Sequence, residues 1–204
     1  MIAIIDYGLG NINAIQCIYK KLNLPIIIAK NPQQLITADK IILPGVGAFD
    51  YAMQSLNDSG MRQTLDDLVL HKKIPVLGIC VGMQILAKSS EEGKMKGLGW
   101  IDAEVKRFDV SSFHHNECIP HMGWNNIQLV GKSKLLNNLE QDARFYYLHS
   151  YYIHCSQQED IIANSYYGIG FTCAIGFENI FGVQFHPEKS HQWGIQLLKN
   201  FAEI

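Results

Sequence analysis

The stretch that decides the fold is Pro75-Val76-Leu77-Gly78-Ile79-Cys80-Val81-Gly82-Met83-Gln84, an apolar strand that passes into a helix through Gly-x-Cys-x-Gly. This pattern predicts a nucleophile elbow with sulfur in place of oxygen. The turn is so sharp that side chains at Gly78 or Gly82 would collide with the strand and the helix. Cys80 should stand at a helix N-terminus, where the dipole favours a thiolate. A buried cysteine on a glycine-rich strand is the alternative interpretation.

A base for this cysteine is found near the C-terminus, in Phe181-Gly182-Val183-Gln184-Phe185-His186-Pro187-Glu188. A residue before proline favours extended backbone, and positions i and i+2 of an extended chain face the same side. His186 and Glu188 can therefore point into one site, where the carboxylate would orient the imidazole and stabilise the imidazolium. His-Pro-Glu alone is typical of a surface turn, but together with the elbow it predicts a Cys-His-Glu triad.

The segments at 78–84 and 184–188 together resemble the triad-type, class I glutamine amidotransferases. Within this class, four motifs resemble the glutaminase subunits of imidazole glycerol phosphate synthases, at residues 6–11, 44–47, 120–125 and 186–190. The resemblance runs from Asp6 to Phe201, and six motifs in one order are far more specific than any one of them.

Length and composition predict a single glutaminase domain over residues 1–204, since 204 residues that are 48% hydrophobic can form one core with little room for a second. The net charge of −2 argues against a nucleic-acid partner. No apolar run reaches the ~18 residues of a membrane span and no signal peptide is recognisable, so we expect a cytoplasmic protein without membrane contact. Five cysteines without a Cys-x-x-Cys pair indicate reduced thiols.

The order of predicted elements indicates an α/β fold: a central, mostly parallel twisted sheet flanked by helices, with an antiparallel extension. Predicted strands lie at 2–6, 25–29, 40–43 and 76–79. They alternate with predicted helices: one begins after Asn11, one begins after Asn31, one covers 61–72 and one follows Cys80. The extension is expected from strand-like runs at 101–108, 124–130, 145–148, 161–166, 171–177 and 180–185, and a last helix from Ser190 as N-cap. The site should lie at the carboxyl ends of the parallel strands.

Hydrolysis through a thioester passes a tetrahedral oxyanion, which requires preorganised amide donors. The elbow supplies the Val81 amide, and the resemblance implies that the second donor is Val46 in Pro44-Gly45-Val46-Gly47. An ordinary strand-end turn is the alternative interpretation of that loop.

The resemblance also implies that the glutamine substrate is bound by Gly47, Gln84, Glu92, Ser150 and Tyr151. Glu92 suits the α-ammonium group, although Gln84 could be a solvated helix residue and Glu91-Glu92 a plain acidic turn. Other histidines compete with His186 as the base, namely His149, His154 and His191, but none is followed by x-Glu. His149 is expected to shape the glutamine pocket.

The segment at 114–121 invites a metal hypothesis because histidine, glutamate and cysteine crowd it. It lacks a recognised ligand spacing, and the adjacent His114 and His115 would point to opposite faces of extended backbone. We therefore expect a polar loop, no metal and no cofactor, with His121 a structural histidine and the role of Cys118 open.

Free ammonia becomes ammonium in neutral water and cannot attack an acceptor, so a glutaminase needs an adjacent synthase. A (β/α)₈ barrel takes about 250 residues and cannot fit in this chain. The resemblance implies a separate cyclase (β/α)₈ barrel subunit, a heterodimer that makes imidazole glycerol phosphate in histidine biosynthesis, and an interface with Asn11, Trp124 and Lys189. A paralogous glutaminase that feeds another barrel, as in sugar amidotransfer for surface polysaccharides, stays open. So does a non-catalytic binding module, although the intact triad argues against it.

Overall fold

The computed structural model describes residues 1–113, 118–139 and 142–204. Its main sheet has the strand order β2-β1-β3-β4-β13-β12-β10-β6-β5, with β11 beside β12 and β8 beside β11. The first five strands in this order are parallel: β2 (Ile26–Ala29), β1 (Ile2–Ile5), β3 (Lys40–Gly45), β4 (Val76–Cys80) and β13 (Ile180–Val183). The predicted parallel sheet is confirmed.

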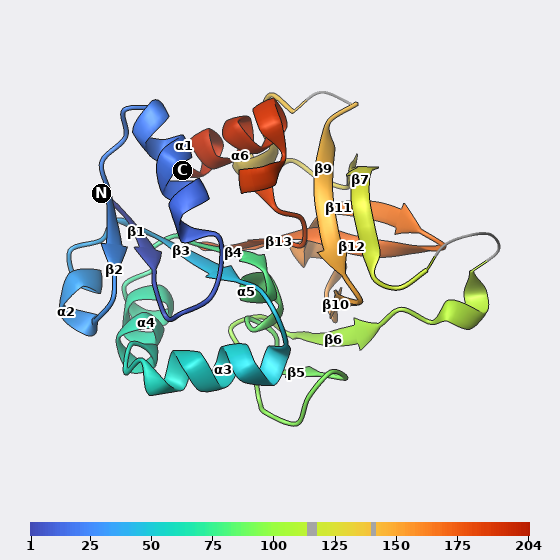
Figure 1. Cartoon of the computed structure of the whole chain (residues 1–204), viewed down its shortest axis with the longest axis horizontal. Coiled ribbons are helices and arrows are strands. Elements are labelled where there is room, and N and C mark those ends of the chain that lie inside the picture. Colours follow the sequence, from blue (N-terminus) through green and yellow to red (C-terminus); the bar gives the residue numbers. More distant parts are fainter. Residues whose placement is uncertain (114–117, 140–141) are drawn as a thin grey trace.

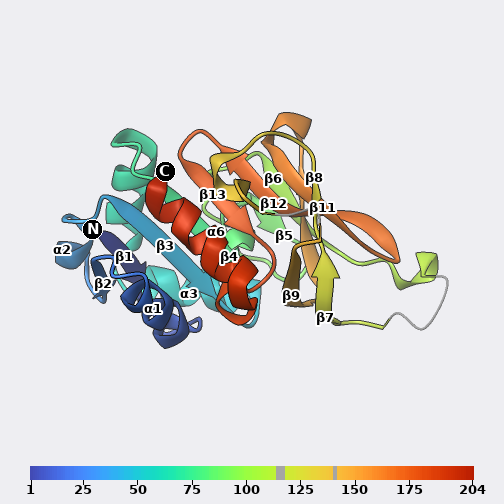
Figure 2. The same cartoon turned by 90° about the horizontal axis from the view of Figure 1, so that it is seen from above.

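Helices cover both faces of the parallel strands (Figure 1). On one face lie α1 (Ile12–Lys21) and α6 (His191–Glu203), and Figure 2 shows α6 along the direction of strand β3. On the other lie α3 (Phe49–Asp58) and α4 (Arg62–Asp66), the latter continued by a π-helical turn at Asp67–His71. Two short helices, α2 (Pro32–Leu35) and α5 (Val81–Gln84), follow β2 and β4. Because both faces are covered, the central strands are buried and read as continuous apolar runs.

The antiparallel extension is also confirmed. The long strand β12 (Ile169–Phe177) pairs antiparallel with β13, β11 and β10. The remaining strands of this region are β10 (Tyr151–Cys155), β11 (Ile161–Tyr167), β6 (Ala103–Arg107), β5 (Ser89–Ser90) and β8 (Gln128–Leu129). A separate pair, β7 (His121–Asn126) with β9 (Arg144–His149), stands beside the main sheet (Figure 1). Short 3₁₀ turns occur at Val110–Ser112, Lys134–Leu136, Gln158–Asp160 and Pro187–Lys189.

The sequence did not predict helix α3, strand β10 or the two-residue strand β5. The apolar residues of α3 follow the spacing i, i+3, i+4, i+7 at Phe49, Ala52, Met53 and Leu56, so the signal for that helix was present. Strand β7 begins three residues before the expected run at 124, because it pairs with β9 from His121 opposite His149.

The predicted helix caps are only partly correct. Asn31 accepts a hydrogen bond from the Gln34 amide, 3.1 Å away, as an N-cap should. Asn11 and Ser190 precede α1 and α6 but make no side-chain capping bond. Both side chains bind instead to the segment around His186, described below. None of the described helices is both long and apolar enough to cross a membrane.

Candidate active site

The elbow has the strained geometry that its sequence predicts. Cys80 has φ +55° and ψ −115°, a left-handed conformation that is rare outside glycine and that joins β4 directly to α5. A Cβ at Gly78 would lie 2.6 Å from the Gly82 oxygen, and one at Gly82 would lie 1.9 Å from the Leu43 oxygen. The expected need for glycine at both positions is therefore confirmed.

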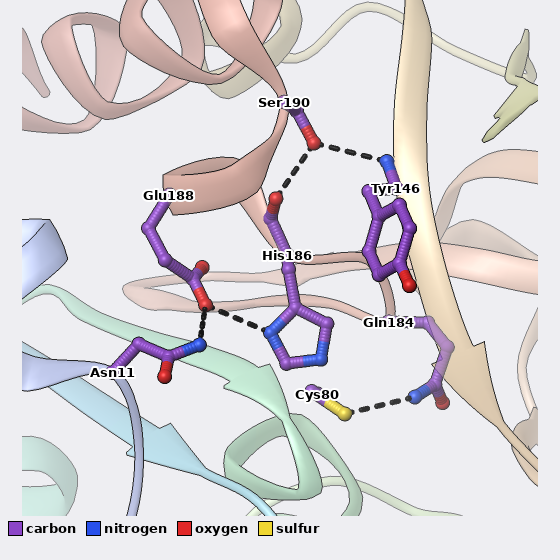
Figure 3. Close-up of polar contacts among 7 residues, drawn as sticks. All are labelled: Asn11, Cys80, Tyr146, Gln184, His186, Glu188 and Ser190. Carbon is purple, nitrogen blue, oxygen red and sulfur yellow. Dashed lines mark hydrogen bonds and ion pairs between the residues drawn. The ribbon is translucent and has the colours of Figure 1, made fainter. Parts of the chain in front are cut away.

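His186 and Glu188 meet as the extended His-Pro-Glu segment predicts. The Nδ1 atom of His186 lies 2.9 Å from Oε1 of Glu188, and their side chains are only 4% and 1% exposed. Figure 3 shows the imidazole pointing toward Cys80. An Nδ1–H group that donates to the carboxylate leaves Nε2 for the sulfur, which is the tautomer that a general base needs.

The charges of the three groups support one another. Burial alone would lower the pKa of His186, but its contacts with Cys80 and Glu188 outweigh burial and raise that pKa to about 10. Burial would likewise raise the pKa of Glu188, yet the contacts with His186 and Asn11 hold it below its usual value. The site thus favours an imidazolium between a carboxylate and the sulfur, the state reached once His186 has taken the proton of Cys80.

Two residues hold the His186 segment in place, and the sequence did not assign them this role. Ser190 Oγ donates to the His186 carbonyl at 2.6 Å and accepts from the Tyr146 amide at 3.0 Å. Asn11 Nδ2 donates to Glu188 Oε1 at 2.7 Å (Figure 3). The His186 amide also donates to the Tyr146 carbonyl at 2.9 Å, which ties the segment to β9.

A second polar side chain, Gln184, also contacts Cys80. Its Nε2 atom lies 3.8 Å from Cys80 Sγ, and the residue is fully buried. The available sequence signal was its position two residues before His186, which places both side chains on one side of the extended chain.

A cavity of about 360 Å³ opens above Cys80. It is lined by the predicted catalytic, oxyanion and substrate residues other than Glu188, together with Asn11 and Lys189. Pro120, Leu148 and His149 complete the wall. Glu188 lies behind His186 instead, and Trp124 does not line the cavity.

The loop at 44–47 is held by packing and a hydrogen bond at its start and has a positive φ at its last residue, Gly47. Gly45 lies opposite Cys80 in the register of β3 and β4, where a Cβ would lie 2.4 Å from the Gly82 amide nitrogen. Tyr7 donates its hydroxyl to the Pro44 carbonyl at 2.7 Å. Gly47 has φ +89°, a left-handed conformation that favours glycine, and nothing lies within 4 Å of an added Cβ there.

Glu92 is held at the rim of the cavity by the start of α3. Its Oε2 atom accepts from the Phe49 amide at 2.8 Å, where the helix dipole favours a carboxylate. In return, Asp50 of α3 accepts from the amides of Lys94 and Met95, at 2.9–3.1 Å. These bonds dock the acidic loop on the helix.

The other histidines do not compete with His186. The Nδ1 atom of His121 lies 2.9 Å from Nε2 of His149, whose own Nδ1 lies 2.8 Å from the Tyr151 carbonyl. Burial lowers the pKa of His149 to about 3 and that of His121 to about 4, so both are neutral. His154 is exposed, and His191 stacks on Trp124 with ring centroids 5.1 Å apart.

Of the three residues expected at a partner interface, Trp124 and Lys189 lie near the surface, whereas the Asn11 side chain points inward. Trp124 is 45% exposed on β7, and Lys189 Nζ lies 5.4 Å from the centre of the Tyr146 ring beside the cavity. Asn11 turns its amide nitrogen inward to Glu188, a contact that the sequence did not predict.

The described residues contain no group of three or more His, Cys, Asp or Glu side chains that could hold a metal. His114 and His115, on which the metal hypothesis rested, lie outside the described residues, and Cys118 is exposed.

Comparison with known proteins agrees with this geometry. A family model described as "Glutamine amidotransferase class-I" matches residues 3–204. The chain is 53% identical to "Imidazole glycerol phosphate synthase subunit HisH" of Bdellovibrio bacteriovorus and, likewise at 53%, to the protein of that name from Leptospira interrogans, with both chains covered completely in each pair. A solved structure described as a glutamine amidotransferase superposes with a TM-score of 0.76 at 16% identity, covering 99% of this chain and 97% of the other.

Proposed function

The chain belongs to the class I glutamine amidotransferase family, and on that premise we propose that it is the glutaminase subunit of imidazole glycerol phosphate synthase. It hydrolyses glutamine to glutamate and ammonia and delivers the ammonia to a cyclase in histidine biosynthesis. Residues 1–204 act as one domain in this role. The observation that carries the proposal is the placement of Cys80 under the cavity with His186 and Glu188 behind it.

The proposed reaction begins when His186 Nε2 takes the proton of Cys80. The thiolate attacks the side-chain carbonyl carbon of glutamine, and the carbonyl electrons move to the oxygen. Collapse of this tetrahedral intermediate breaks the C–N bond, and His186 gives its proton to the leaving ammonia. Water, deprotonated by His186, then hydrolyses the thioester to release glutamate.

Two backbone amides are assigned to the oxyanion, those of Val81 and Val46. Val81 is the first residue of α5, directly after the nucleophile, and Val46 follows the residue that pairs with Cys80 in the sheet. Donors of this kind act on charge that develops only in the transition state, and each contributes roughly 10²–10³ to the rate.

The α-ammonium and α-carboxylate groups of the glutamine substrate are assigned to the outer part of the cavity. Glu92 suits the α-ammonium because its carboxylate is held at the rim. Gln84 can offer only its side-chain oxygen to a ligand, because its Nε2 already donates to Gln184 and to the Tyr151 carbonyl. Gly47, Ser150 and Tyr151 are the remaining proposed contacts.

The partner in this proposal is a separate cyclase barrel subunit that forms a heterodimer with the chain. The names of the relatives support it, since each is a subunit of imidazole glycerol phosphate synthase. Trp124 and Lys189 suit an interface beside the cavity, where ammonia could pass without meeting bulk water.

The test is to mix the purified chain with the cyclase barrel and its acceptor and to follow imidazole glycerol phosphate. Glutamine should support synthesis with the wild type and fail with Cys80→Ala, whereas ammonium at raised pH should support synthesis with both. Glutamine hydrolysis that serves only a different barrel would identify a paralogous system. Absence of hydrolysis with any partner would indicate a binding module.

A further inference from the structure

The sulfur of Cys80 has a polar neighbour that takes no part in the triad. Gln184 Nε2 lies 3.8 Å from Cys80 Sγ, within hydrogen-bonding reach of a sulfur acceptor (Figure 3). Gln184 immediately follows β13, and its own backbone amide donates to the Cys173 carbonyl at 2.8 Å. The sulfur therefore lies between the imidazole of His186 and the carboxamide of Gln184.

The surrounding hydrogen bonds decide which end of the carboxamide faces the sulfur. Gln184 Oε1 accepts from Gln84 Nε2 at 3.0 Å, so its oxygen is occupied by a donor and its nitrogen is turned toward Cys80. The same Gln84 nitrogen donates to the Tyr151 carbonyl at 3.0 Å, which leaves it without a third hydrogen to give. The orientation of Gln184 is thus set by its hydrogen bond to the buried Gln84 side chain and not by contact with a ligand.

We propose that Gln184 is a further catalytic residue, whose side-chain N–H donates to the Cys80 thiolate and holds it for attack. This inference rests on the proposed glutaminase function. Charge on a buried sulfur is costly unless hydrogen-bond donors face it, and an amide can donate without taking the proton. The proton of Cys80 still goes to His186, and no bond to Gln184 forms or breaks.

The location of Gln184 separates this role from substrate binding. The residue does not line the cavity, whereas Gln84 does. Loss of the Gln184 donor should therefore lower the rate of attack by the sulfur and leave glutamine affinity nearly unchanged. A defect in packing alone would predict neither a selective loss of sulfur reactivity nor an unchanged KM.

The experiment compares Gln184→Met, which has a similar shape but cannot donate, with the wild type in the complex with its synthase. Both carry Cys17→Ser and Cys118→Ser, because those exposed thiols would also react. Two quantities are measured at one pH: the rate of Cys80 alkylation by iodoacetamide, and kcat and KM for glutamine. We expect alkylation and kcat to fall about tenfold or more, as for the loss of a hydrogen bond to a charged group, with KM within about twofold. Gln196→Met, the same change on α6, should alter neither.

A second variant keeps the test decisive if Gln184→Met does not fold. Gln184→Glu retains the shape and places a carboxylate against the sulfur, so alkylation and kcat should fall further. Wild-type rates of alkylation and hydrolysis in either folded variant would overturn the role of Gln184. Failure of the proposed function would give a different result. In that case the wild-type complex itself would show no glutamine hydrolysis that depends on Cys80.

Discussion

The side-chain nitrogen of Asn11 lies 2.7 Å from the Glu188 carboxylate, although the two residues are 177 positions apart in the chain. The same oxygen, Oε1, lies 2.9 Å from Nδ1 of His186. The loop between β1 and α1 is thereby joined to the far end of the triad, so it can influence the base through Glu188.

Asn11→Ala should lower kcat about tenfold, because it removes one hydrogen bond that holds a charged carboxylate in position. Turnover at saturating glutamine is measured for the free chain and for the complex. Asn13→Ala, an exposed change two residues further along, on α1, is the control. A loss confined to the complex would assign Asn11 to the interface instead of the triad.

His186→Ala should reduce kcat by roughly 10⁴ or more, and Glu188→Gln should leave more activity, because an orienting carboxylate contributes less than the base. Burst kinetics of thioester formation give the comparison. Near wild-type turnover in His186→Ala together with a dead His149→Ala would mean that the wrong histidine has been chosen as the base.

The buried pair His121 and His149 should make the protein sensitive to acid. The pKa of His149 is about 3 in the fold against about 6.5 when unfolded, so the unfolded state takes up the proton first. The contribution of neutral His149 to the free energy of unfolding is present above pH 6.5 and is lost as the pH falls toward 3. Between pH 7.5 and pH 5 this loss is about 2 kcal/mol.

Urea unfolding at those two pH values checks this dependence on His149. His149→Leu should lose about 2 kcal/mol less than the wild type between them. His186 titrates in the same way in both proteins, so its opposite contribution, lost from pH 6.5 upward to about 10, cancels in the comparison. Exposed His154→Ala should behave as the wild type does. Identical pH dependence in wild type and His149→Leu would contradict the buried neutral pair.

Gly82→Ala should cost about 3 kcal/mol or more in the free energy of unfolding, because the new methyl group would meet the backbone oxygen of Leu43. Gly170→Ala is the matched control, since nothing lies within 4 Å of its added Cβ. Chemical denaturation of the two variants measures the difference. An equally stable Gly82→Ala protein would be incompatible with the elbow described above.

The free chain should hydrolyse glutamine slowly and gain at least about 10² in turnover from the partner with acceptor bound. The physical basis is the 44–47 loop. Gly45 and Gly47 flank Val46, so the peptide that carries the Val46 N–H can rotate and turn this donor away from the oxyanion. Steady-state turnover of the free chain and of the complex gives the ratio, and a value near one would rule out this switch.

The sequence by itself determined the elements with local causes. Gly78 and Gly82 predict the elbow because only glycine tolerates the close approach of strand and helix, and the proline after His186 predicts an extended segment that aims His186 and Glu188 together. The parallel order of the first strands followed from their alternation with helices. Each of these signals lies within a few residues of the feature that it predicts.

Only the tertiary structure decided which distant polar groups meet. Asn11 and Ser190 have the sequence pattern of helix caps, but their side chains bind Glu188 and His186, because folding brings those partners within reach. Gln184 could be placed on the same side as His186 from the sequence, but its contact with Cys80 depends on β13 lying beside β4. Hydrogen bonds between side chains far apart in the chain are set by strand order and register, which no local pattern encodes.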